Sequence, residues 1–564
     1  MGLFKMRIMF LLLLSLSFCL GATESPSTTP GSHILYLMHT GNTEQALRAY
    51  EALRQETGSH DFELVERIGL VLLDQGFRIK DPETQLLTLF GAGISGNEKA
   101  LYIVEDGLAS NQQELELISL NFLARYHNDR ADQILHRAMK SNSLLIRLEA
   151  AFQLADKKDP KAVGQIEGLM SKLPEQVWAI FPQLFAISGT PEAKKILRKL
   201  LTNSNEQIRV ASIISVAQYG HDDFLPIIER LASHHEVIQQ EACAAALGAL
   251  RDEGAISKLQ QLARSPNITV QLAALQSLYA LGREEVRGEV EKIAKTRDLF
   301  AISLLGNMPG SEPVLVELIK YPDLQVRVNA AAALLELQDS RCLVPLCPIL
   351  IRDSRDFAVV KVNSHGKSLS AFKVVPSAKE NFAQEPIVLE MSLHLREALL
   401  MKAVELPEKD FLSIAHKIFE TQQNDLVPVL IEILENHPTP AVIALLKKYQ
   451  EKVGAPLIRN YCNLALYRLK EPGPYADNLR DWVTQQCNVD LIQFRPVVPW
   501  DMRVSTGSSF ELTPQETSRL LVDSFESFVS VQDDKGIDML ISVIQKGNSK
   551  NKYALIGLLM RAIQ

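Results

Sequence analysis

Residues 91–96 read GAGISG and match the pattern G-x-G-x-x-G with which dinucleotide-binding enzymes hold a pyrophosphate. Glu114 follows after roughly twenty residues, where such enzymes place the acid that binds the ribose. In those enzymes the glycine loop follows a β-strand, and the pyrophosphate sits at the N-terminus of the next helix. Here the flanking residues have helical periodicity on both sides. We therefore interpret the match as a coincidence of the repeat described below and expect no cofactor.

Other reactive residue types do not assemble into a recognisable motif. The chain has 12 His residues, but no H-E-x-x-H, C-x-x-C or similar paired spacing occurs. His234 and His235 are adjacent, so on a helix they point about 100° apart and cannot readily share one ion. Neither G-x-S-x-G nor a Walker loop is found. The sequence predicts a protein that is not an enzyme and has no metal site.

Charged residues limit the class of partner. The formal net charge is −8, which argues against broad nucleic-acid binding. Basic residues nevertheless gather on two neighbouring repeats, where stacking would form an anion-attracting patch or simply a solvated face. Its members are Lys157, Lys158, Lys161, Lys194, Lys195, Arg198 and Lys199. A second candidate surface consists of residue types favoured at binding hot spots, although packing of an extended segment explains them equally well: Phe494, Arg495 and Trp500.

The elements that position these residues follow a period of 31 residues. One column of the repeat is always Ala or Gly: Gly93, Ala124, Ala155, Ala186, Ala217 and Gly248. Two columns of a second helix keep the same spacing, the first being Ala100, Ala131, Ala162, Ala193, Phe224 and Ala255, and the second Val104, Leu135, Ile166, Leu197, Ile228 and Leu259. Neither helix of such a pair can bury its apolar face except against its partner and the next repeat. We expect the small residue to let the second helix approach, and glycines in the left-handed conformation to end first helices: Gly96, Gly189, Gly220 and Gly282.

The repeats resemble the HEAT family, in particular its short bacterial variety related to phycobilin-lyase repeats. The resemblance is carried by IRLEAAFQLA from Ile146, IRVASIISVAQYG from Ile208, EACAAALGALRDEGA from Glu241, VQLAALQSLYALG from Val270 and VRVNAAAALLELQD from Val326. It is strong over residues 84–350. It implies an all-α fold, an α-solenoid in which antiparallel helix pairs form a right-handed superhelix.

The N-terminus has the three-part layout of a secretory signal peptide. Lys5 and Arg7 precede an apolar stretch over residues 8–20, and the small residues Gly21 and Ala22 follow. The stretch is shorter than the roughly 20 residues of a membrane span. We expect a signal peptide over 1–22, hence a periplasmic or secreted protein. Lipidation at Cys19 is the less favoured alternative, because Phe18 occupies a site that requires a small residue.

The remaining cysteines do not predict a disulfide framework. Five are left after cleavage, and we interpret them as small buried residues. The sequence leaves undecided whether Cys342 and Cys347 form a disulfide bond.

The remaining boundaries follow from changes in pattern. We expect a polar linker at 23–32, a TPR-like capping helix pair at 33–83, the HEAT array at 84–352, and an inserted β-hairpin region at 353–392. Further HEAT-like helices are expected at 393–470, a Pro-rich irregular strap at 471–512, and a C-terminal helical cap at 513–564 that opens with the capping box TPQE. In the hairpin, strand residues include Val360, Val362, Phe372 and Val374.

These features favour a non-enzymatic scaffold that is exported and binds a protein or peptide in the cell envelope or outside the cell. Two alternatives remain open. Relatives of this repeat type include bilin lyases and a partner domain of a hydroxylase, which would imply a cofactor-handling or lyase-like protein. The chain could equally be a structural component of the cell envelope.

Overall fold

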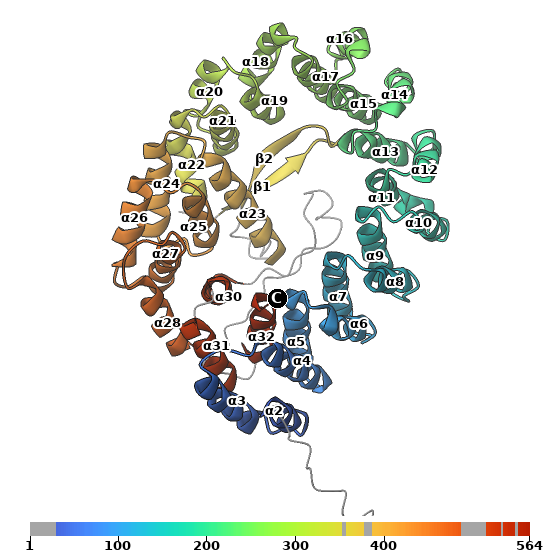
Figure 1. Ribbon diagram of the computed structural model, residues 1–564. Coiled ribbons are helices and arrows are strands. Elements are labelled where there is room, and N and C mark those ends of the chain that lie inside the picture. Colours follow the sequence, from blue (N-terminus) through green and yellow to red (C-terminus); the bar gives the residue numbers. More distant parts are fainter. Residues whose placement is uncertain are drawn as a thin grey trace, which may run out of the picture. The chain divides into compact units, whose positions relative to one another are not determined.

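The computed structural model describes residues 30–351, 357–376, 386–486, 515–531, 534–546 and 551–563. Within these ranges the chain is built from antiparallel helix pairs and one two-stranded sheet (Figure 1). It divides into two compact units. The terminal unit comprises the described residues of Met1–Ile103 and Phe528–Gln564, and the array unit those of Val104–Gln486 and Asp490–Ser527.

The terminal unit joins the two ends of the chain. Its helices are α2 (Pro30–His39), α3 (Thr43–Thr57), α4 (Phe62–Arg78), α5 (Pro82–Ser95), α31 (Asp534–Lys546) and α32 (Asn551–Ala562). Helix α32 packs against α4 and α5, and α31 contacts α3, as Figure 1 shows in blue and red. The expected capping helices at the N-terminus are therefore covered by helices of the expected C-terminal cap.

Glycines allow this close packing. A Cβ atom added to Gly91 of α5 would lie 2.1 Å from the backbone oxygen of Tyr553 in α32. One added to Gly557 would lie 2.0 Å from the backbone oxygen of Gly91. No side chain fits at either position without moving a backbone. The first glycine of GAGISG is thus a helix-packing residue.

The rest of GAGISG ends the helix, as the sequence predicts. Helix α5 stops at Ser95, and Gly96 has φ 62° with its N–H bonded to the carbonyl of Gly93. The expected left-handed conformation is confirmed at all four glycines: Gly96, Gly189, Gly220 and Gly282. Glycine adopts this conformation without the Cβ penalty of other residues. The segment is helical, so a Rossmann loop is excluded at this position.

A buried polar cluster fastens α3 to α31 in the terminal unit. The Tyr50 hydroxyl and Nδ1 of His60 lie 3.0 Å apart, and Nε2 of His60 lies 3.2 Å from a carboxylate oxygen of Asp538. Arg54 donates to the same carboxylate at 3.2 Å. Burial lowers the pKa of His60, although the Asp538 carboxylate acts in the opposite direction.

The array unit is a row of helix pairs. Its first helices are α7 (Gln113–Arg125), α9 (Leu144–Asp156), α11 (Phe181–Ser188), α13 (Glu206–Gln218), α15 (Val237–Ala249), α17 (Ile268–Ala280), α19 (Leu299–Leu304) and α21 (Leu324–Glu336). The second helices are α6 (Leu101–Leu108), which begins in the terminal unit, α8 (Asp129–Ala138), α10 (Ala162–Met170), α12 (Pro191–Leu201), α14 (Leu225–Leu231), α16 (Ile256–Leu262), α18 (Arg287–Lys295), α20 (Glu312–Leu318) and α22 (Leu343–Leu350). Each first helix contacts the next first helix in the row.

The row continues beyond the inserted sheet. It contains α23 (Pro386–Ala403), α24 (Glu408–Glu420), α25 (Val427–Asn436), α26 (Pro440–Gln450), α27 (Pro456–Arg468), α28 (Tyr475–Gln486) and most of α30 (Glu516–Ser530). Short 3₁₀ turns lead into many second helices: η1 (Glu98–Ala100), η3 (Asp222–Phe224), η4 (Glu253–Ala255), η5 (Glu284–Val286) and η7 (Ser340–Cys342). Two others, η2 (Glu175–Ile180) and η6 (Leu305–Asn307), flank first helices.

The 31-residue columns form the core. All members of the two second-helix columns, from Ala100 to Leu259, are at most 1% exposed. This confirms the predicted repeat and the α-solenoid. The small-residue column works differently from our expectation at Gly248, where an added Cβ would lie 2.3 Å from Oγ of Ser277. Ser277 belongs to the first helix of the next repeat, so here the small residue lets neighbouring repeats, not the two helices of one repeat, approach.

The predicted β-hairpin is confirmed. Strand β1 (Phe357–Asn363) pairs antiparallel with β2 (Ser370–Pro376), with Val362 opposite Ala371. The hairpin lies along first helices, because β2 contacts α19 and α21 while β1 contacts α23 (Figure 1). The Asn329 side chain of α21 binds both backbone groups of Phe372, each at 2.8 Å, as a neighbouring strand would.

The hairpin tip reaches a buried acid in the middle of the array. Glu241 of α15 is 1% exposed and accepts hydrogen bonds from the hydroxyls of Ser364 and, at 2.6 Å, Ser368. Gly366 lies so close that an added Cβ would be 2.6 Å from the Glu241 carboxyl carbon. The hairpin tip therefore contacts a helix that lies more than a hundred residues earlier in the sequence.

Several expected boundaries differ from the observed ones. Helix α2 begins at Pro30, inside the expected linker, and α23 begins at Pro386, inside the expected hairpin region. Helix α28 occupies residues 475–486 of the expected strap, because the two prolines before Tyr475 permit a helix to start there. The expected signal peptide with Cys19 and the residues TP of the capping box lie outside the described residues.

Four cysteines are described, and all are free and buried: Cys243, Cys342, Cys347 and Cys462. Cys342 and Cys347 therefore form no bridge in this structure. Burial raises the pKa of the Cys342 thiol to about 12. Both observations agree with their interpretation as small buried residues.

Candidate binding site

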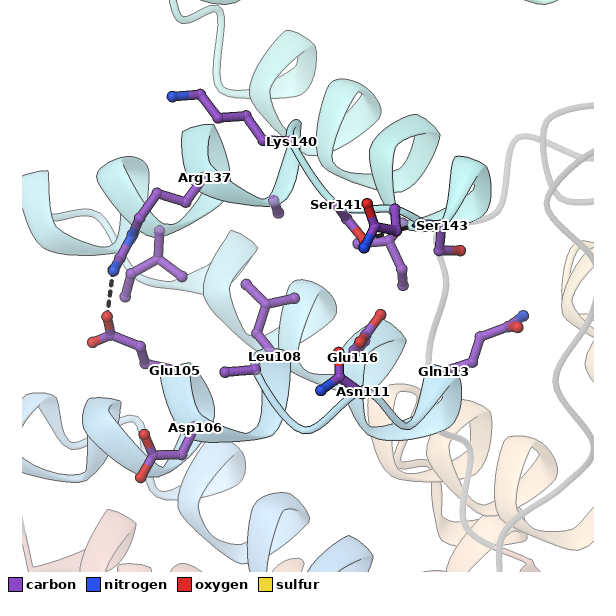
Figure 2. Close-up of a pocket in the computed structure, with 15 residues that line it drawn as sticks. Glu105, Asp106, Leu108, Asn111, Gln113, Glu116, Arg137, Lys140, Ser141 and Ser143 are labelled. Carbon is purple, nitrogen blue, oxygen red and sulfur yellow. Dashed lines mark hydrogen bonds and ion pairs between the residues drawn. The ribbon is translucent and has the colours of Figure 1, made fainter.

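A cavity of about 690 Å³ opens between two neighbouring repeats of the array unit (Figure 2). It lies where α6 and α7 meet α8 and α9, and its size is within the range typical of ligand pockets. Its apolar lining is Leu108, Ala109, Ile134, Ala138 and Ile146. Its polar lining is Glu105, Asp106, Asn111, Gln113, Glu116, Arg137, Lys140, Ser141, Asn142 and Ser143.

Two equivalent turns form the sides of the cavity. Ser110 and Asn111 precede α7, and Ser141 and Asn142 precede α9 at the 31-residue spacing. In each turn the serine hydroxyl accepts a hydrogen bond at 3.2 Å from the backbone N–H two residues later. Serine favours such local turns over continued helix, which explains why the helices are interrupted here.

One wall of the cavity carries a satisfied ion cluster. Glu105 of α6 accepts hydrogen bonds from Arg137 and, at 3.0 Å, from Arg130, both of α8. Burial alone would raise the pKa of Glu105, but the two arginines outweigh it and hold the pKa below its usual range. The cluster bridges neighbouring second helices, and the Arg137–Glu105 pair is drawn in Figure 2.

Glu116 differs from the other charged lining residues because it is buried and the described residues supply no partner for it. It is the fourth residue of α7, is only 9% exposed, and points into the cavity beneath Ser141 (Figure 2). No hydrogen bond or ion pair reaches its carboxylate from any residue that the structure describes. Burial raises the pKa of Glu116, and no neighbouring charge offsets it. Burying a carboxylate without hydrogen-bond donors costs free energy of folding. A hydrogen-bond donor or a cation bound in the cavity would reduce this cost.

The lining of the cavity is rich in hydrogen-bonding groups. It contains serine hydroxyls, amides and carboxylates, but the described lining has neither histidine nor cysteine, so Ser141 and Ser143 have no imidazole base. A search of the described residues for clusters of His, Cys, Asp and Glu that could hold a metal ion found none. The described helices also include none that is both long and apolar enough to cross a membrane.

Three of the seven residues of the predicted basic patch form ion pairs with acids of the chain itself. Lys194 and Arg198 of α12 both bind Asp223, at 2.9 and 3.2 Å. Lys157 binds Asp132 at 2.6 Å. The exposed remainder is Lys158, Lys161, Lys195 and Lys199. An acid of the next repeat therefore faces part of the predicted patch, and its other four basic side chains stay exposed.

The other predicted surface, Phe494, Arg495 and Trp500, lies outside the described residues. Sequence reasoning missed Glu116. The signal was nonetheless present in the repeat, since Ile146-Arg147 and Ile208-Arg209 align with Leu115-Glu116 at multiples of 31 residues. An acid therefore stands where the resembled family has arginine.

Comparison with known proteins finds no matching family model and no curated protein that matches in sequence. Solved structures do resemble the chain. The complex of CpcE and CpcF of phycocyanin lyase from Nostoc sp. PCC7120 is 19% identical with a TM-score of 0.29, over 38% of this chain and 92% of that chain. Kap121p is 12% identical with a TM-score of 0.35, over 93% of this chain and 70% of that chain. UNC-45 from Drosophila melanogaster is 12% identical with a TM-score of 0.27, over 96% of this chain and 82% of that chain.

These three structures are helical solenoids of the HEAT and armadillo kind. Because the identities and TM-scores are low, the fold assignment rests on the helix pairs described above. Nothing about binding or activity follows from the likeness.

Proposed function

We propose that this protein is an exported, non-enzymatic HEAT-repeat scaffold that binds a protein or peptide partner in the cell envelope or outside the cell. The observation that carries the proposal is the cavity between α6–α7 and α8–α9, whose lining offers hydrogen-bonding groups without an evident reactive pair. Repeat arrays present extended surfaces of this kind to partners. Export rests on the N-terminal sequence pattern alone.

A site-specific crosslink tests the binding proposal. A photoreactive amino acid replaces Asn142, which is exposed and lines the cavity, so the substitution leaves the core intact. The matched control places the same group at Val344 of α22, which is 84% exposed and lies outside the cavity. After irradiation of intact cells, we expect one defined protein or peptide to be crosslinked from position 142 and not from position 344.

The same experiment separates the alternatives. A small molecule that co-purifies, with no protein crosslinked at position 142, would favour a cofactor-handling protein and contradict the scaffold. Equal crosslinking from positions 142 and 344 would indicate nonspecific encounters with other proteins and no binding site at the cavity. Export is checked separately by cell fractionation and by mass spectrometry of the mature N-terminus, which we expect after Gly21 or Ala22.

A further inference from the structure

In four other repeats, a side chain in the first turn of the first helix, or in the 3₁₀ helix just before it, closes the preceding turn. Nε1 of Trp178 donates to the carbonyl of Leu173 at 3.0 Å, and Nε2 of Gln240 donates to that of His234 at 2.7 Å. Each donor binds a carbonyl five or six residues earlier in the chain. We call this the turn-donor position. Three of its residues follow the 31-residue spacing: Trp178, Arg209 and Gln240.

Arginine at the turn-donor position makes the most hydrogen bonds to the turn. Arg209 donates to the carbonyls of Asn203 and Ser204, at 2.9 and 2.8 Å. Arg327 donates to the carbonyls of Tyr321 and Pro322, at 2.9 and 2.6 Å. A guanidinium has five donors in a fixed planar arrangement, so one group reaches both carbonyls of the turn at once.

Glu116 holds the turn-donor position of its own repeat, 93 residues before Arg209. A carboxylate only accepts hydrogen bonds, so it cannot close the turn. The equivalent carbonyls belong to Ser110 and Asn111, six and five residues earlier, and Asn111 adopts φ 58°. The site therefore combines a buried carboxylate with a turn that lacks its donor, and it opens on the cavity instead of being filled.

The positive charges around the cavity do not fill this position. Arg137 is paired with Glu105, and Lys140 is exposed at the rim. Arg147 holds the turn-donor position of the next repeat and makes no ion pair with Glu116 in the described part of the chain. Its own Nε is buried without a hydrogen-bond partner.

We propose that the cavity binds an arginine side chain of a peptide partner, with Glu116 as its counter-ion and the Ser110–Asn111 turn as the second acceptor. The guanidinium takes the place that Arg209 and Arg327 fill from within their own repeats. This inference rests on the proposed function and specifies what the partner must present. Asn142 and Ser143, on the opposite turn, are placed to contact the peptide backbone beside that arginine.

Titration calorimetry of the full-length protein tests the proposal with small probes. The first probe is N-acetyl-arginine amide, and the second is N-acetyl-citrulline amide, which has nearly the same shape without the charge. We expect the arginine probe to bind at least tenfold more tightly than the citrulline probe. Equal affinity for the two, or no binding of the arginine probe, would overturn the proposal.

Substitutions locate the binding. Glu116→Gln keeps the size of the side chain and removes its charge, and it should weaken arginine binding at least tenfold. Glu116→Arg should abolish binding, because the new guanidinium closes the turn from within. Glu114→Gln is the matched control, since Glu114 is exposed in the same helical turn and lies outside the cavity. Unchanged affinity in Glu116→Gln, with the fold confirmed by its unfolding transition, would contradict the assignment.

The outcome separates this inference from the proposed function. A partner that crosslinks at position 142 equally well in the Glu116→Gln protein would leave the scaffold standing and overturn the arginine site. Arginine binding that depends on Glu116, without any crosslinked partner, would support the site and contradict the scaffold.

Discussion

Two glutamates on first helices of the array have opposite surroundings. Glu241 of α15 is 1% exposed and accepts hydrogen bonds from two serine hydroxyls of the hairpin. Glu116 of α7 is 9% exposed and receives none from the described residues. A buried carboxylate is tolerated where donors surround it and is costly elsewhere. The inserted hairpin supplies hydrogen-bond donors to Glu241. At Glu116 the described part of the chain supplies none and leaves a cavity.

The difference distinguishes a structural acid from an acid available to a ligand. At Glu241 the donors come from the same chain, so the interaction holds distant repeats together. At Glu116 we propose that the donor comes from a ligand. The predictions below test the two sites against each other, beginning with the largest expected effect.

Removing the donors of Glu241 should make it resemble Glu116 and destabilise the fold. We expect the double variant Ser364→Ala/Ser368→Ala to lose about 3 kcal/mol of unfolding free energy, because it leaves a buried carboxylate without hydrogen bonds. Urea denaturation measures the loss. Ser370→Ala, a substitution of the same type in β2, should change stability by less than about 0.5 kcal/mol. Equal effects of the two variants would show that the contact with Glu241 contributes nothing specific.

Removing the side chain that seats the hairpin should have a smaller effect. Asn329→Ala deletes both hydrogen bonds to the backbone of Phe372 and should cost about 2 kcal/mol. The backbone N–H of Phe372 donates to this side chain, so its hydrogen exchange should accelerate in the variant. If that exchange rate stays unchanged, the amide of Asn329 does not protect the strand edge.

At Glu116, removal of charge should stabilise the protein. Glu116→Gln eliminates the burial of an unpaired carboxylate and should raise the unfolding free energy by about 1 kcal/mol at pH 7, whereas Glu114→Gln should be nearly neutral. Loss of stability in Glu116→Gln would reveal a partner within the chain.

The pH dependence of this effect has a definite sign. The pKa of Glu116 is raised in the folded state, so the folded protein binds more protons than the unfolded one above the unfolded pKa of about 4.3. The wild-type protein should therefore gain stability relative to Glu116→Gln as the pH falls through the raised pKa. Denaturation curves of both proteins between pH 4 and pH 7 measure this difference.

The ion pairs at the predicted basic patch should give the smallest effect. Both cations at Asp223 are partly exposed, and such pairs contribute about 0–1 kcal/mol. We expect Asp223→Asn to change stability by less than about 1 kcal/mol, and less at high salt. The same substitution should raise the affinity of the patch for anionic probes, because it frees Lys194 and Arg198.

The sequence predicted the parts of the fold that depend on local periodicity. The buried second-helix columns, the helix end at Gly96 and the strand residues Val360 and Phe372 all follow from spacing within one or two elements. The same spacing predicted two helices per repeat, and the HEAT resemblance implied the α-solenoid. Each of these features is set by apolar burial at a regular interval.

Other features depend on contacts between distant parts of the chain, which spacing alone does not reveal. The hairpin tip and Glu241 are separated by 123 residues, so no local pattern predicts their contact. Asp223, in the next repeat, pairs with Lys194, so part of the predicted basic cluster is paired within the chain. Glu116 could have been found from the sequence, but only by asking which column of the repeat carries a donor and where that donor is missing.

The central claim is that the cavity holds a guanidinium where the repeat lacks its own donor. The most direct measurement is a crystal structure of the protein with N-acetyl-arginine amide. We predict that its guanidinium lies within hydrogen-bonding distance of the Glu116 carboxylate and of a carbonyl of the Ser110–Asn111 turn. An empty cavity at saturating ligand, or a ligand bound only elsewhere, would contradict the claim.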